Sequence, residues 1–239
     1  MSLRTQSLNK TVTGVSCVIY GAILESHAAG YTDVTDMYQI FTSKKRLTRS
    51  LSYPQRTHPP PFWKTTENWK DIPTFNTVYT FIHSIFRKAQ VEPELLIVAL
   101  LYLGEFLKRA EDLHINSETW QRLCFVTIVL ASKHWDDISC SSSSFSLCSN
   151  GELTLHDLNS MELIVLSTLE WDLYLTSDHY RDIYYNLKSL WTNFEFDVNT
   201  GEAAEVSNDV MKYLSVEPWW GVKRVFGFEV EEYCLNTGL

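Results

Sequence analysis

The chain has 239 residues, 45% of them hydrophobic and 21% charged, so it is long enough to bury a core without disulfides or structural metals. Its formal net charge of −9 excludes the overall basic surface that is typical of nucleic-acid-binding proteins. The most apolar stretch, Leu95 to Leu103, is far shorter than the roughly 20 residues of a membrane-spanning helix, so we expect no membrane insertion.

The first segment with helical periodicity runs from Thr11 to about Glu25 and is weakened by two glycines. We predict that residues 1–42 form an N-terminal extension whose helix packs on the main domain. Its apolar stripe consists of Val12, Val15, Ile19 and Ile23.

Residues 43–72 interrupt the pattern with a basic run and several prolines, which indicates a linker or a loop laid over the domain surface. Within it, RSLSYP matches the R-S-x-S-x-P pattern that 14-3-3 proteins bind once the second serine is phosphorylated. The candidate residues are Arg49, Ser50, Ser52 and Pro54. Because such short motifs also arise by chance in serine- and arginine-rich linkers, both interpretations stay open.

Residues 73–191 show five successive helical patterns and no convincing alternating strand. The third helix, from Asn116 or Ser117 to about Trp135, is apolar on every face, which predicts that it is the central helix. A polar, serine-rich loop is expected at 139–151, and Thr154 with Asp157 predicts the N-terminal cap of the fourth helix. The sequence therefore predicts an all-α fold: five helices, the extra N-terminal helix and a C-terminal extension at 192–239.

The end of the third helix and the two helices after it resemble the cyclin box. VTIVLASKHWDDIS, at 126–139, is similar to the end of that domain's third helix, and the segment 159–191 is similar to its fourth and fifth helices. Within the family, the ASK-x-WDD arrangement and the Tyr-rich fifth helix resemble the cyclin Y group, which is related to the phosphate-pathway cyclins of yeast.

The resemblance implies a regulatory subunit that binds and activates a cyclin-dependent-type protein kinase of the PCTAIRE kind, with all catalytic groups in the partner. The kinase-contacting lysine and glutamate of cyclins correspond to Lys133 and Glu162, with Trp135 and Asp136 beside them. An ordinary solvated helix end is the alternative for each residue. The first helix lacks the M-R-A-I-L-type docking motif of cell-cycle cyclins, so we do not expect that kind of substrate recruitment.

We expect neither enzymatic activity nor a cofactor or metal, because no catalytic or phosphate-binding motif and no metal-ligand spacing is found. The five scattered cysteines are interpreted as reduced thiols of a cytoplasmic or nuclear protein. A second function stays open, that of a cyclin-fold adaptor without kinase activation. In that case Trp219 and Trp220 of the C-terminal extension would contact partners, although they could equally pack back on the domain.

Overall fold

The computed structural model describes residues 3–31, 34–42, 72–149 and 152–192. This part of the chain contains seven α-helices, one 3₁₀ helix and no strand, so the predicted all-α fold is confirmed. The RSLSYP motif, Trp219 and Trp220 lie outside the described residues. The elements are α1 (Leu3–Ala28), η1 (Asp36–Phe41), α2 (Phe75–Ala89), α3 (Glu94–Arg109), α4 (Trp120–Trp135), α5 (Ser142–Cys148), α6 (Leu155–Thr168) and α7 (Ser177–Thr192).

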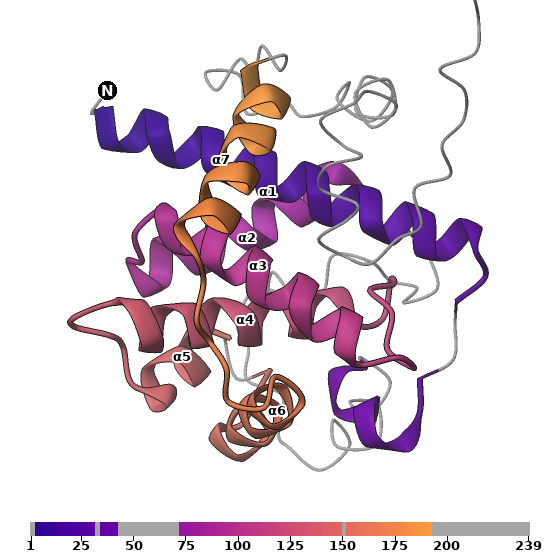
Figure 1. Cartoon of the computed structure of the whole chain (residues 1–239). Helices are drawn as coiled ribbons and strands as arrows, with labels where there is room; N and C mark the ends of the chain where they lie inside the picture. The colour runs from indigo at the N-terminus through magenta and orange to yellow at the C-terminus, as the bar shows by residue number, and fades with distance from the viewer. Residues whose placement is uncertain (1–2, 32–33, 43–71, 150–151, 193–239) are drawn as a thin grey trace, which may run out of the picture.

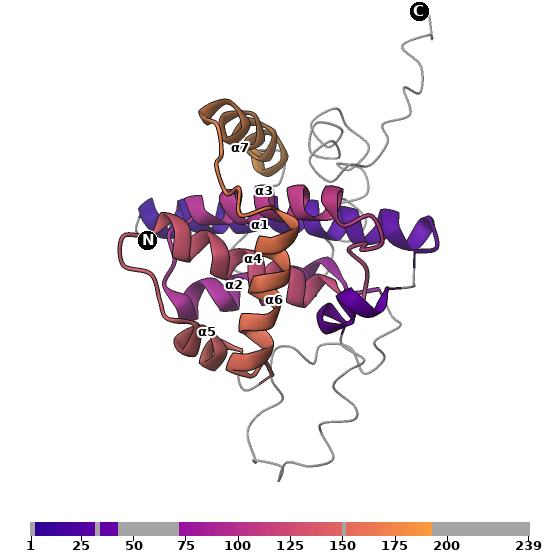
Figure 2. The same cartoon turned by 60° about the horizontal axis from the view of Figure 1, so that its bottom comes forward.

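Helices α3 and α4 pack against each other at the centre of the fold (Figure 1). Helix α1 covers α2 and α3, while α6 crosses α4 and α5 lies against both α2 and α6 (Figure 2). Helix α7 rests on α1 and α3, well apart from α6, and residues 169–176 connect the two. This arrangement brings the end of α4 together with α5 and the middle of α6.

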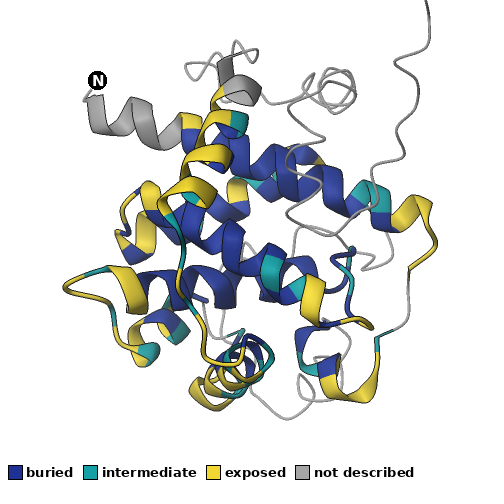
Figure 3. Ribbon diagram, viewed as in Figure 1, coloured by how far each residue is buried: buried dark blue, intermediate teal, exposed yellow. Residues whose placement is uncertain are grey.

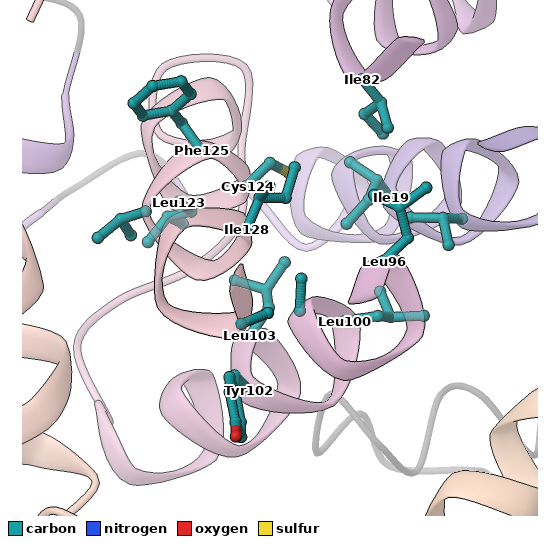
Figure 4. Packing of buried hydrophobic residues seen from close by; sticks show 14 of the residues in the cluster. Ile19, Ile82, Leu96, Leu100, Tyr102, Leu103, Leu123, Cys124, Phe125 and Ile128 are labelled. Carbon is teal, nitrogen blue, oxygen red and sulfur yellow. The ribbon is translucent and has the colours of Figure 1, made fainter. Parts of the chain in front are cut away.

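The core surrounds α4, as its sequence predicts. Every residue from Trp120 to Ser132 is buried, and α3 is buried almost as completely (Figure 3). Ile128 and Cys124 of α4 face Leu100 and Leu103 of α3, with Ile19 of α1 close by (Figure 4). A helix without a polar face can only be stable when other elements cover it on all sides.

Three helix boundaries follow from local capping. Gln90 ends α2 in the left-handed conformation, at φ 53°, where the pattern of apolar residues also ends. Thr154 and Asp157 form the predicted capping box of α6, since each side chain accepts from the other residue's backbone N–H, at 3.0 and 3.4 Å. The third predicted helix begins later than expected, at Trp120, because the Asn116 side chain accepts from the N–H groups of a preceding turn, at 2.9 and 3.2 Å.

Helix α1 is longer than predicted, and from Thr11 to Ile23 nearly its whole circumference is buried rather than a single stripe. It ends at Ala28, and Gly30 in the turn that follows has a φ of 75°, which suits a residue without a side chain. The Gly30 N–H donates to His27 O and the Tyr31 N–H to Ser26 O, which satisfies the last carbonyls of the helix.

The prediction of a polar loop at 139–151 is wrong in part, because residues Ser142–Cys148 form α5. Serine has a modest helix propensity and the segment has no apolar periodicity, so local signals do not reveal this helix. Its Phe145 is fully buried and packs edge-on against Phe125 of α4, with ring centroids 6.4 Å apart. Tertiary burial of one aromatic ring, together with the Ser141 cap, therefore stabilises the helix.

Candidate functional site

Lys133 and Glu162 form an ion pair between two helices that are distant in sequence. The Lys133 Nζ lies 2.5 and 2.8 Å from the two carboxylate oxygens of Glu162. Lys133 stands in the last turn of α4, where the buried helix reaches the surface, and Glu162 lies on the side of α6 that packs across α4. The structure thus brings together the two residues that the family resemblance singles out.

The two partners differ in their exposure. The Lys133 side chain is 31% exposed and that of Glu162 only 10%. A carboxylate this buried is costly without a counter-charge, so the lysine compensates the charge of Glu162 while part of its own side chain stays exposed. Removal of the lysine would leave an unpaired, nearly buried carboxylate.

Ser142, the first residue of α5, is a third member of this cluster. Its hydroxyl accepts a hydrogen bond from the Lys133 Nζ at 2.5 Å. Sequence reasoning missed Ser142 because α5 was expected to be a loop. The run of serines from 141 to 144 was the signal available, but it did not single out one of them.

The other two predicted site residues bond to different groups. The Trp135 indole N–H donates to the Tyr102 hydroxyl at 2.7 Å, and that hydroxyl donates to the carbonyl of Leu173 at 2.9 Å. Burial raises the pKa of Tyr102 to about 12, so it stays a neutral donor. The Trp135 ring itself remains 48% exposed, anchored through its nitrogen.

Asp136 ends α4. Its N–H donates to the Ser132 carbonyl at 3.0 Å, and its carboxylate accepts from the Ser132 hydroxyl at 2.9 Å. This is a capping role, which fixes the direction in which the chain leaves the helix just beyond Lys133.

Exposed apolar side chains stand on the elements that carry the ion pair. Ile138, two residues after the end of α4 is capped, is 95% exposed, and Leu163 of α6, next to Glu162, is 55% exposed. Leu147 of α5 is 79% exposed. The outer side of these elements is correspondingly coloured as exposed in Figure 3. Exposed apolar side chains on or beside the helices that hold a charged pair suit the binding of a protein partner.

Two half-buried cysteines take part in hydrogen bonds that connect α5 and the preceding loop to the end of α2. The Cys140 thiol donates to the Ala89 carbonyl at 3.7 Å, and the Lys88 ammonium donates to the Cys148 carbonyl at 3.4 Å. Burial raises the pKa of the Cys148 thiol, with a further contribution from Cys140, while Lys88 opposes the shift. The four cysteines among the described residues are free thiols.

The described structure also bears on metal binding and on membrane insertion. Within the residues it covers, no group of three or more histidine, cysteine or acidic side chains could hold a metal ion. None of the helices it describes is long and apolar enough to cross a membrane. The void between α1, α2, α3 and α4 is lined by apolar core side chains and Thr127, whose hydroxyl bonds to its own helix.

Comparison with known proteins agrees with this architecture. The family model described as "Cyclin, N-terminal domain" matches residues 40–174, more than half of the chain. That match begins at the end of η1 and stops before α7, whereas the box predicted from the sequence spans 73–191.

Two curated relatives come from Arabidopsis thaliana. Cyclin-U2-1 is 29% identical over 106 residues, which cover 44% of this chain and 46% of that protein. Cyclin-U4-1 is 29% identical over 100 residues, which cover 42% of this chain and 48% of that protein. The chain thus spans about half the length of the curated relatives it matches. With the helical architecture and the extent of the family match, these findings show that the chain belongs to the cyclin family.

Proposed function

We propose that the chain is the regulatory subunit of a cyclin-dependent-type serine/threonine kinase and binds it through the Lys133–Glu162 surface. This surface is defined by Lys133, Ser142 and Glu162 with the exposed side chains of Trp135 and Ile138. The observation that carries the proposal is the partly open ion pair, in which α4 and α6 contribute one charge each. Membership of the cyclin family supports it.

The chemistry of the pair suits the recognition of protein backbone. An ammonium donates to carbonyl oxygens and a carboxylate accepts from N–H groups, so together they can bind both ends of a peptide unit. In this proposal the rigid helical surface docks on the kinase's regulatory helix and holds it inward, so that its glutamate pairs with the ATP-binding lysine. The catalytic groups all belong to the kinase, and the chain itself catalyses nothing.

The test begins with affinity purification of the full chain from eukaryotic cells and identification of its partners by mass spectrometry. We expect a cyclin-dependent-type kinase among the dominant partners. The decisive variant exchanges the two charges, Lys133→Glu with Glu162→Lys. It keeps an ion pair between α4 and α6, and so most of the stability, but presents the opposite charge at each position to a partner.

We expect the charge-exchanged protein to unfold near the wild-type temperature and to lose kinase binding and activation. The matched control is Lys108→Glu, since Lys108 stands in the last turn of α3 and pairs on the surface with Glu105 at 3.7 Å. That variant should bind normally. Normal binding and activation by the charge-exchanged protein would show that the site is placed wrongly.

The same experiment separates the second function from the first. An adaptor with a cyclin fold would bind partners without raising the activity of a kinase, so activity towards a peptide substrate is measured with and without the chain. Binding without activation would favour the adaptor.

Finer assignments belong to the proposal as well. The ASK-x-WDD end of α4 and the Tyr-rich α7 support a cyclin Y-like member with a PCTAIRE-type kinase. Binding of a 14-3-3 protein at Ser52, within Arg49 to Pro54, is proposed from the sequence motif alone. A cytoplasmic or nuclear location also stays a prediction.

A further inference from the structure

The hydrogen bonding of Lys133 is complete within the chain. Its ammonium has three protons, and three oxygen atoms lie within 2.8 Å: both carboxylate oxygens of Glu162 and the hydroxyl of Ser142. A carbonyl of a partner can bind this lysine only by displacing one of them. The Ser142 hydroxyl is the one to exchange, because it is neutral and therefore the weaker acceptor.

Ser142 also lies where a modifying enzyme can reach it. Ser142 is half-buried. The preceding residues Asp137, Ile138, Ser139 and Ser141 are exposed, and Cys140 among them is half-buried. Helix α5 has only seven residues, so opening its first turn breaks few hydrogen bonds. Two later serines are less accessible to a modifying enzyme: the Ser146 hydroxyl donates to the Leu153 carbonyl, and Ser149 is fully buried.

We propose that Ser142 is a phosphorylation site and that its phosphorylation blocks the Lys133–Glu162 surface. This inference rests on the proposed function and adds its regulation. In the reaction, the Ser142 hydroxyl oxygen attacks the γ-phosphorus of ATP and the bond to the β–γ bridging oxygen breaks. ADP leaves, and the hydroxyl proton passes to a base of the modifying kinase.

Phosphorylation changes the charge next to Lys133. A phosphate carries about −1.5 to −2 charges at neutral pH, where the hydroxyl carries none. Its oxygens hold the ammonium more strongly than a neutral hydroxyl does, and compete with Glu162 for the same protons. The site changes from a balanced ion pair to a net anionic cluster, which repels the carbonyl oxygens that Lys133 would otherwise bind.

The test compares full-length chains that carry phosphoserine, introduced during translation, at position 142 or at position 143. Ser143 is the matched control, since it is exposed and adjacent on α5. The probe is the purified cyclin-dependent-type kinase that is recovered with the chain from cells. We expect phosphoserine at 142 to weaken binding by about tenfold or more and phosphoserine at 143 by less than about twofold. Ser142→Ala should bind about threefold more tightly, because it frees one proton of Lys133.

Phosphopeptide mapping provides the second arm. Chain purified from cells is separated into kinase-bound and kinase-free fractions, and phosphate on Ser142 is expected in the free fraction. Absence of phosphate from Ser142 there, or equal affinity of the unmodified and 142-phosphorylated chains, would overturn this inference alone. If the unmodified chain binds no such kinase, the proposed function fails and the regulation with it.

Discussion

Tyr102 connects three parts of the molecule through one hydroxyl group. It stands in α3, accepts from Trp135 of α4 and donates to Leu173 in the segment between α6 and α7. Because Tyr102 is only 2% exposed, its hydroxyl has little access to water that could replace these partners. A single buried hydroxyl thus fixes the end of α4, where the proposed kinase-binding surface begins.

We therefore predict that Tyr102→Phe lowers the free energy of unfolding by about 1–2 kcal/mol, since it removes both hydrogen bonds and leaves the Leu173 carbonyl without its donor. Urea denaturation measures the change. Tyr174→Phe is the control, because Tyr174 is 79% exposed and its replacement should change stability by less than about 0.5 kcal/mol. Equal midpoints for wild type and Tyr102→Phe would disprove the structural role of this hydroxyl.

At the scale of elements, α6 and α5 show two ways in which a helix becomes stable. Helix α6 begins with a capping box that can be predicted from the sequence, and its apolar side packs on α4. Helix α5 has no such periodicity and depends on Phe145, which the core buries completely. Both helices position a residue of the cluster around Lys133.

The capping box gives a prediction for α6. Thr154→Ala removes the acceptor of the Asp157 N–H, and we expect it to cost about 0.5–2 kcal/mol of stability. Thr154→Ser keeps a hydroxyl in the same place and should lose much less. Thermal unfolding followed by circular dichroism compares the two variants. An alanine variant as stable as the serine variant would mean that the cap contributes nothing.

At the scale of the whole molecule, α1 is part of the same core as the helices of the box. Ile19 is 1% exposed and lines one internal void together with residues of α2, α3 and α4. The sequence predicts that residues 1–42 form an N-terminal helical extension that packs on the box. The described structure shows one continuous cluster of buried side chains that includes both.

A shared core predicts shared stability. Ile19→Ala should lower the free energy of unfolding by about 2–5 kcal/mol, because it enlarges a cavity that cannot fully collapse, whereas Ile19→Val should cost about 0.5–1.5 kcal/mol. Hydrogen exchange read by mass spectrometry tests the coupling. The amides of α1 and α4 should lose protection by the same factor. Faster exchange in α1 alone would make it an independent extension.

The helical class, the central position of α4 and the α6 cap can all be predicted from the sequence alone. These depend on properties that are local along the chain, such as apolar residues around a helix or a threonine three residues before an aspartate. The family resemblance likewise pointed to Lys133 and Glu162, although spacing along the chain alone could not place two helices beside each other.

The remaining features could not be predicted in this way, because each depends on contacts between residues that are far apart in sequence. Helix α5 forms because its Phe145 packs against Phe125 of α4, and α1 is buried on nearly its whole circumference because α2, α3 and α7 cover it. The same packing places Ser142 against Lys133 and turns an ion pair into a cluster of three residues. Helix propensities contain no information about which helices pack together, and the cluster around Lys133 forms only because α4, α5 and α6 do so.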